Sequence, residues 1–347
     1  MRSTTGWQSL DPTGNTLTRV TFERRDLRPD DIAVRIDYCG VCHSDLHRIH
    51  GMLGEKDLVP GHEATGVVVA TGQAVTGFAV GERVAIGTIV DSCGECAMCL
   101  AGQENYCYHR PTTTYGGTDR IDGTPTKGAY SREYVLREKF AFHLPDGLDP
   151  AAAAPLMCAG VSVWEPLRAA GAGPGSRVAV AGLGGLGHLA VKLAAALGAE
   201  VTVLSRTAAK EQDALRLGAA ALLVTTDEAQ VAAARGRFDL VLDTIAADHE
   251  LTPLIGMLGL DGTLCVLGNP LLAGPRLWKL GAGRKKLTSS GTGGLRQTVE
   301  MLEFCAEHGI TADVEILPSS EVETALNRLA AGDVRYRFVL DLSDLDK

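Results

Sequence analysis

The sequence predicts an α/β protein with two domains, a β-rich module followed by a doubly wound parallel sheet. Three observations support this fold class. The chain of 347 residues is longer than one typical hydrophobic core requires. Its first part contains short strand patterns separated by glycines, and strands alternate with helices over about residues 177–268. We place the first domain at residues 1–157, the second at 158–296 and a return to the first domain at 297–347.

The composition is that of a globular protein, with 45% hydrophobic and 22% charged residues. The net charge of −9 argues against nucleic acid or an anionic membrane surface as a partner. An aromatic content of 5% disfavours a surface for base stacking. The first residues lack the apolar core of a signal peptide, and no run reaches the roughly 20 apolar residues of a membrane span. We therefore expect a cytoplasmic protein.

The strands of the first module are recognised by alternation. Residues 32–38 alternate between apolar and polar side chains, as a half-buried strand does. Residues 64–70 and 82–86 follow the same pattern and are separated by glycines. Because no helical pattern lies between them, these strands predict a compact β-rich module.

Residues 40–47 and 61–63 form the first chemical motif. They bring a thiolate, an imidazole and a carboxylate into one neighbourhood, and these are ligand types of zinc. A catalytic zinc takes three protein ligands and keeps one position open, so a third firm ligand must come from elsewhere. Cys158 is our candidate. Cys42 alone would be read as an ordinary buried thiol, and the rest of the chain is what favours zinc.

The segment 91–109 contains four cysteines at metal-binding spacing. It has too few apolar residues to build a core of its own, so a cross-link must hold it. Four thiolates close a tetrahedral site, which makes the predicted zinc structural. A redox Cys-x-x-Cys would need two thiols at the start of a helix instead. The predicted ligands are Cys93, Cys96, Cys99 and Cys107.

A glycine-rich turn at 182–187 lies between a predicted strand, 177–181, and a predicted helix, 188–197. In that context the Gly-x-Gly-x-x-Gly spacing is typical of a dinucleotide fingerprint, because glycines let the backbone approach a pyrophosphate at the helix N-terminus. The alternative is a glycine-rich turn without a ligand. The predicted cofactor-binding residues of this turn are Gly182, Gly184, Gly185, Leu186 and Gly187.

The next strand, 201–204, ends in residues that select the cofactor. Ser205 and Arg206 follow it, and no carboxylate stands at its tip to hold a ribose 2′-hydroxyl. A hydroxyl and a guanidinium suit a 2′-phosphate, which predicts NADP(H). Lys210 is either a further phosphate ligand or a solvated helix charge. The remaining expected strands are 239–243 and 264–268, with a helix at 295–308 and strands at 314–317 and 336–340.

Together these motifs resemble the zinc-dependent medium-chain dehydrogenase/reductase family, in its cinnamyl alcohol dehydrogenase-like branch. The likeness covers nearly the whole chain. It implies a GroES-like catalytic domain, a Rossmann domain, two zinc ions per subunit and an NADP-dependent alcohol dehydrogenase. It also implies a homodimer, formed through edge strands near residues 264–268. The segments that carry the likeness are 40–47, 61–63, the four-cysteine segment, 158–164 and 182–187.

The resemblance also implies the roles of the site residues. Cys42, His62 and Cys158 would hold the catalytic zinc, with Glu63 as an occasional fourth ligand. Asp45 stays outside the ligand set, as a supporting residue.

The resemblance implies two further residues that would transfer the proton of the substrate alcohol. Ser44 would relay the alcohol proton, and His47 would pass it on through the cofactor ribose. Ser44 has an alternative role as the cap of a helix start, and His47 could be an ordinary surface residue.

The substrate class follows in part from a difference between this sequence and other members of the family. Residues 108–113 lack the pocket tryptophan of lignin-pathway members, which puts a coniferyl-type substrate in doubt. We expect a broad reductase of aromatic and medium aliphatic, cinnamaldehyde-like aldehydes. The rival enzyme is an NAD-dependent polyol or secondary-alcohol dehydrogenase of the same superfamily. A non-enzymatic NADP-binding protein is disfavoured, because all three catalytic zinc ligands are present.

Overall fold

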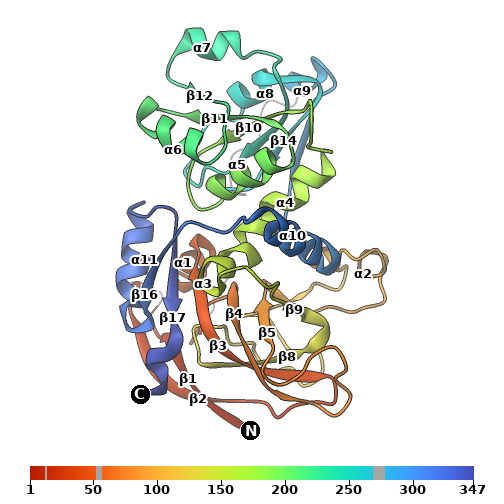
Figure 1. The fold of residues 1–347 in the computed structure, drawn as a ribbon, viewed down its shortest axis with the longest axis vertical. Coiled ribbons are helices and arrows are strands. Elements are labelled where there is room, and N and C mark those ends of the chain that lie inside the picture. The colour runs from red at the N-terminus through yellow and green to blue at the C-terminus, as the bar shows by residue number, and fades with distance from the viewer. Residues whose placement is uncertain (12–13, 52–56, 269–277) are drawn as a thin grey trace. The chain divides into compact units, whose positions relative to one another are not determined.

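A computed structural model describes the chain except for residues 12–13, 52–56 and 269–277. Its contacts divide the chain into two compact units (Figure 1). The first unit comprises Met1–Cys158 and Gly294–Lys347, and the second comprises Ala159–Gly293. Cys158 therefore belongs to the first unit and not, as we had placed it, to the second. The reason is local, since its sulfur lies 3.2 Å from the Nε2 atom of His62.

A seven-stranded sheet forms the centre of the first unit. The C-terminal strand, residues 337–341, pairs with the third strand of the chain, residues 31–41, so distant parts of the sequence lie side by side in this sheet (Figure 1). In this register Val339 lies opposite Gly40. The strand order is β16 (Val314–Pro318), β17 (Arg337–Asp341), β3 (Asp31–Val41), β4 (Ala64–Thr71), β5 (Arg83–Ile86) and β9 (Ala141–His143), and β8 (Glu133–Arg137) also pairs with β3.

The predicted alternation places the core of this unit. Ile32, Val34 and Ile36 of β3 are fully buried, and Arg35 between them is exposed. Burying a side chain of this size contributes about 1.5–3 kcal/mol relative to leaving it exposed. The antiparallel pairs β1 (Arg2–Ser9) with β2 (Leu17–Arg24) and β6 (Ile89–Asp91) with β7 (Thr112–Thr113) complete the strands of the unit.

The helices of the first unit are short except for one. The longest begins and ends where the sequence predicts, at residues 295 and 308. Asp149 caps the helix that follows it by accepting a hydrogen bond from the Ala152 N–H. The helices are α1 (His43–Ile49), α2 (Ala97–Leu100), α3 (Pro150–Ala153), α10 (Leu295–His308) and α11 (Val322–Ala330).

The second unit is a six-stranded parallel sheet with the Rossmann strand order 3-2-1-4-5-6. This confirms the predicted doubly wound fold. Val178, Val180 and Leu242 in its central strands are fully buried, as expected for a sheet covered on both faces. The strands in spatial order are β12 (Ala221–Val224), β11 (Glu200–Ser205), β10 (Arg177–Ala181), β13 (Phe238–Asp243), β14 (Leu258–Val266) and β15 (Lys286–Ser289). The helices are α4 (Ala159–Ala169), α5 (Gly187–Ala196), α6 (Glu211–Arg216), α7 (Glu228–Ala233), α8 (Thr252–Met257) and α9 (Trp278–Gly281).

The expected edge strand near residues 264–268 is wrong. Leu264 pairs with Val241 of β13 on one side and with Leu287 of β15 on the other. Within the described residues, β15 is therefore the edge strand on this side of the sheet. It was missed because it is short and largely polar, whereas the apolar stretch before residue 268 has the stronger strand signal.

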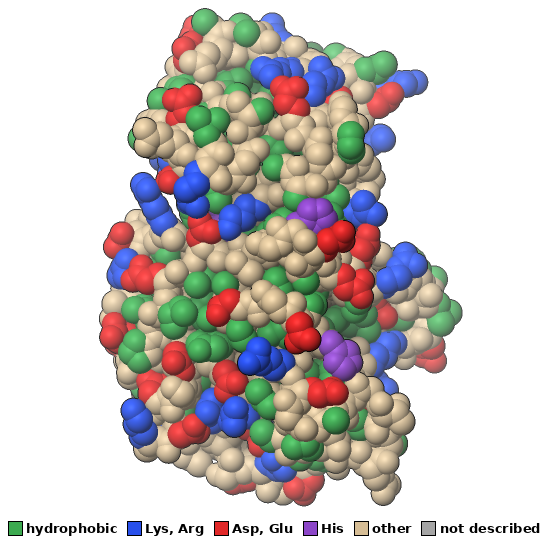
Figure 2. All heavy atoms as spheres, in the orientation of Figure 1, with side chains coloured by type: hydrophobic (Ala, Val, Ile, Leu, Met, Phe, Trp, Pro, Cys, Tyr) green, Lys and Arg blue, Asp and Glu red, His purple; other side chains and the backbone are tan. Residues whose placement is uncertain are grey.

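The surface agrees with the acidic composition. Figure 2 shows acidic and basic side chains interspersed over the face in view, without one continuous basic patch. Among the described residues, no helix has the length and apolar character needed to cross a membrane.

Candidate functional site

Three predicted zinc ligands meet in the first unit. The ligand atoms of Cys42, His62 and Cys158 all lie within 4.8 Å of one another, and all three side chains are buried. The two sulfurs are 4.0 Å apart, close to the spacing of about 3.8 Å that two thiolates have on a tetrahedral zinc and far from the ~2 Å of a disulfide. The hydrogen bond from the Cys158 thiol lowers the pKa of Cys42, which favours a thiolate there. The donor set therefore fits a zinc ion.

Asp45 supports this cluster from behind. Its carboxylate is fully buried and accepts the Nδ1–H of His62 at 3.1 Å, the Cys42 N–H at 2.9 Å and the Tyr130 hydroxyl at 3.2 Å. Because Nδ1 carries the proton, the lone pair of Nε2 is left for a metal on the Cys158 side. Asp45 is thus placed as a supporting residue and lies outside the ligand cluster.

Glu63 turns toward a cation that the sequence analysis missed. Its Oε1 atom accepts a hydrogen bond from the guanidinium of Arg337, and both side chains are buried. Its Oε2 atom has no partner in the described part of the chain. Burial raises the pKa of Glu63, and the positive charge of Arg337 opposes that rise. Gly40 makes room for the pair, since a Cβ there would overlap the Glu63 carboxylate.

The orientation of Glu63 leaves its predicted role as a fourth zinc ligand open. The missed partner did have a signal in the sequence. Arg337 stands directly before the apolar run 338–340 of a predicted strand, and a cation that a strand carries into a core needs a counter-charge.

Ser44 and His47 both lie on exposed positions of α1. Cys42 occupies the N-cap of this helix, so the alternative role of Ser44 as a cap is wrong. The Ser44 hydroxyl lies 3.7 Å from the Cys42 sulfur, at the border of the ligand cluster. The proton-relay roles of both residues stay predictions.

The four cysteines of the segment 91–109 also form one cluster. Their sulfurs lie within 4.8 Å of one another, and α2 carries the third ligand, Cys99. Cys99 is 3.8 Å from Cys93 and 3.6 Å from Cys96, again the spacing that a tetrahedral zinc produces. His109 also lies close to Cys93, but the four sulfurs fill a tetrahedral site without it.

The glycine turn of the second unit has the three features that a dinucleotide fingerprint requires. Gly182 has a φ of +89°, which opens the tight turn after β10. At Gly184 a Cβ would meet no atom within 4 Å, so a ligand can approach the backbone there. A Cβ on Gly187 would overlap the Gly182 carbonyl, which explains the third glycine. Gly185 and Leu186 complete the turn, and the site fits a pyrophosphate.

The cofactor-selecting residues lie at the end of β11. Ser205 is its last residue, Arg206 is exposed, and no acidic side chain stands at this tip. The ammonium of Lys210 donates to the carbonyl of Leu183 at 3.0 Å, which brings this lysine to the glycine turn. The predicted contacts to a 2′-phosphate stay predictions.

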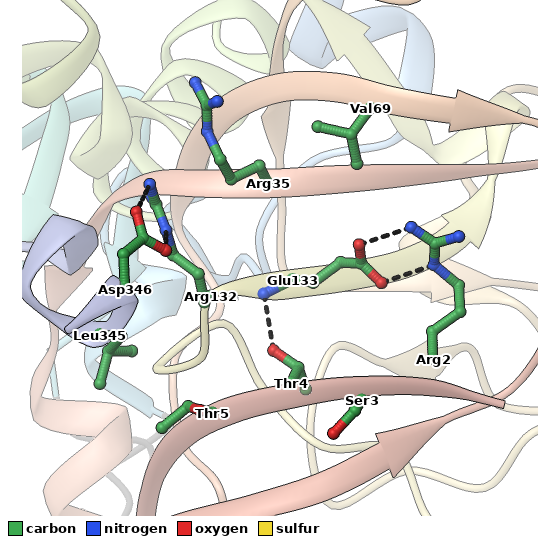
Figure 3. A pocket seen from close by; sticks show the side chains of 10 residues that line it. All are labelled: Arg2, Ser3, Thr4, Thr5, Arg35, Val69, Arg132, Glu133, Leu345 and Asp346. Atoms are coloured by element: carbon green, nitrogen blue, oxygen red, sulfur yellow. Dashed lines mark hydrogen bonds and ion pairs between the residues drawn. The ribbon is translucent and has the colours of Figure 1, made fainter.

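A pocket of about 400 Å³ elsewhere in the first unit contains none of the predicted site residues (Figure 3). Two ion pairs cross it, from Arg2 to Glu133 and from Arg132 to Asp346. Both of its acids are thus paired with arginines, while its third arginine, Arg35, pairs with Asp37 outside the pocket.

The chain matches two family models in order. Residues 28–146 match the alcohol dehydrogenase GroES-like domain, and residues 185–307 match the zinc-binding dehydrogenase. The chain is 44% identical to a probable formaldehyde dehydrogenase AdhA of Bacillus subtilis, covering 94% of each protein. It is 47% identical to an NADP-dependent alcohol dehydrogenase C 1 of Mycolicibacterium smegmatis, covering 95% of each.

A solved structure of a cinnamyl alcohol dehydrogenase from Sorghum bicolor superimposes with a TM-score of 0.93, at 40% identity and 98% coverage of both chains. The matched length spans both units. The chain therefore belongs to the zinc-binding medium-chain alcohol dehydrogenase family, in its cinnamyl alcohol dehydrogenase-like branch, and is an alcohol oxidoreductase.

Proposed function

We propose that the protein is a zinc-dependent, NADP(H)-dependent alcohol dehydrogenase that reversibly reduces aromatic and medium aliphatic aldehydes of the cinnamaldehyde type. The observation that carries this proposal is the buried cluster of Cys42, His62 and Cys158. Three protein ligands with two thiolates are the set of a catalytic zinc site, which needs one further position for the substrate oxygen. The second cluster, at Cys93 to Cys107, holds a structural zinc.

The chemistry divides between the bound groups and the protein. Zinc supplies a Lewis acid for the alcohol or aldehyde oxygen, and the nicotinamide supplies or accepts the hydride. Asp45 holds His62 in the tautomer that binds metal through Nε2. Ser44 takes the alcohol proton at the border of the cluster, and His47, exposed on the same helix, passes it on through the cofactor ribose.

The preference for NADP(H) is supported by Ser205 and Arg206 and by the absence of a carboxylate at the described tip of β11. Arg206→Asp places a negative charge where the 2′-phosphate binds. We expect this variant to lose the preference for NADPH over NADH in Kd.

The edge strand β15 offers the pairing surface for a homodimer, because its outer backbone groups have no neighbouring strand in the described chain. A cytoplasmic location fits the nine free cysteines, because the two groups proposed as zinc ligands need reduced thiols.

The test is NADPH oxidation with cinnamaldehyde, with NADH in a parallel cuvette. We expect rapid oxidation of NADPH and little of NADH. Comparable rates with both cofactors would overturn the cofactor assignment. Formaldehyde is run beside cinnamaldehyde as the hydride acceptor, and mannitol is compared with cinnamyl alcohol in the reverse direction, by reduction of NADP+. A clear preference for formaldehyde or for mannitol would overturn the proposed substrate class.

A further inference from the structure

The carbonyl groups of the glycine turn are held by side chains from outside it, beginning with Thr244. This residue follows β13, the strand next to β10. Its hydroxyl lies 2.8 Å from the carbonyl oxygen of Ala181 and 3.2 Å from that of Gly182. The Gly182 N–H donates to Leu204 of β11 at 3.1 Å. The entrance of the turn is thereby fastened to the strands on both sides of β10.

The next two carbonyls are held in the same way. The ammonium of Lys210 donates to the Leu183 carbonyl at 3.0 Å. The fully buried ring of His188 donates its Nδ1–H to the Gly184 carbonyl at 3.2 Å, and the His188 backbone N–H donates to the same oxygen at 3.0 Å. Thus every carbonyl from residue 181 to 184 lies within hydrogen-bond distance of a side-chain donor, and those of Ala181 and Gly182 share the single hydroxyl hydrogen of Thr244.

The backbone N–H groups of the turn, unlike its carbonyls, are not held by side chains. In a trans peptide the C=O of one residue and the N–H of the next point in opposite directions. Fixing the three carbonyls at 182–184 therefore fixes the N–H groups of Leu183, Gly184 and Gly185. In the described chain these N–H groups donate to no protein atom. Such a row of free donors before a helix N-terminus suits an anion.

We propose that Thr244, His188 and Lys210 are positioning residues that hold the amides of the glycine turn toward the cofactor diphosphate. The inference rests on the proposed use of a dinucleotide and adds the residues that pre-organise the turn for it. They touch the turn and not the diphosphate. Without these side chains the peptide groups of the turn can rotate, and ordering them when the cofactor binds costs free energy.

Two matched pairs of variants test the proposal. Thr244→Val and His188→Leu remove the donors, whereas Thr244→Ser and His188→Asn keep one at a similar place. The Kd is measured by fluorescence for NADPH and for adenosine 2′-monophosphate, which carries the 2′-phosphate but no diphosphate. Melting temperature and zinc content are measured for each variant as checks on folding.

We expect Thr244→Val and His188→Leu to raise the Kd of NADPH about tenfold and to leave that of adenosine 2′-monophosphate within about twofold. Thr244→Ser and His188→Asn should keep the Kd of NADPH close to the wild-type value. The inference is overturned if Thr244→Val and His188→Leu leave the Kd of NADPH unchanged, or if they weaken the binding of both ligands equally. If the wild-type protein binds no NADPH, the proposed function itself fails.

Lys210→Met separates the two roles of this lysine. If Lys210 holds the turn, this variant should raise the Kd of NADPH and leave the Kd of adenosine 2′-monophosphate unchanged. A matching loss with adenosine 2′-monophosphate would make Lys210 a phosphate ligand and remove it from the set.

Discussion

Asp45→Asn probes how the catalytic metal site is held. The carboxylate is fully buried and accepts hydrogen bonds from His62, Cys42, Gly61 and Tyr130. An amide of the same shape keeps one acceptor oxygen and turns an NH₂ group toward donors, so about two of these four lose a partner. Each buried donor left unpaired costs about 1–3 kcal/mol, which gives a loss of about 2–6 kcal/mol in the free energy of unfolding.

Metal affinity should fall as well, because His62 loses the partner that fixes its tautomer. Loss of such a partner typically costs about 10–100-fold in affinity, or about 1.4–2.8 kcal/mol. Zinc per subunit is measured against a graded chelator, together with thermal unfolding. We expect one zinc to leave at roughly tenfold or more lower chelator concentration while the other stays. An unchanged chelator profile would refute the role of Asp45.

Three further predictions concern separate parts of the molecule. Cys158→Ser should lose one zinc and nearly all turnover while NADPH still binds; near wild-type turnover would show that the third ligand lies elsewhere. Cys99→Ser should lose the other zinc and lower the melting temperature, because a structural zinc contributes folding free energy; the reasoning fails if neither changes. Burial disfavours the charge on Asp119, but hydrogen bonds from Arg28 and the backbone hold its pKa at about 2, below the 3.8 of a free Asp. A lowered pKa adds stability at neutral pH that is lost as the pH falls toward 2, so Asp119→Asn should cost up to about 2 kcal/mol at pH 7 and about half as much at pH 3. The prediction is wrong if wild type and Asp119→Asn differ by the same free energy of unfolding, measured with denaturant, at both pH values.

Local patterns were enough to predict much of the fold. The bounds of α10 and β10 match the sequence prediction, because period and flanking glycines are properties of neighbouring residues. The strand β1 was missed because its residues are mostly polar. It pairs with the next strand, β2, and a distant contact, from Trp7 to Ser319, adds to that pairing.

The site shows the same division. Ligand types singled out Cys42 and His62, the family resemblance completed the set with Cys158, and the structure brings the three together. The pairing of Glu63 with Arg337 joins residues 274 positions apart and depends on the register of β17 against β3. No sequence period records such a register, so the sequence marks Arg337 as a cation that needs a counter-charge but does not identify Glu63 as its partner.

The most direct test of the central claim is the zinc content of the wild-type protein during chelation. The account predicts two zinc ions per subunit. One should leave together with aldehyde reductase activity, and the other should stay until the protein unfolds. A single zinc per subunit, or full activity after one zinc has left, would contradict the assignment of Cys42, His62 and Cys158 as the catalytic site.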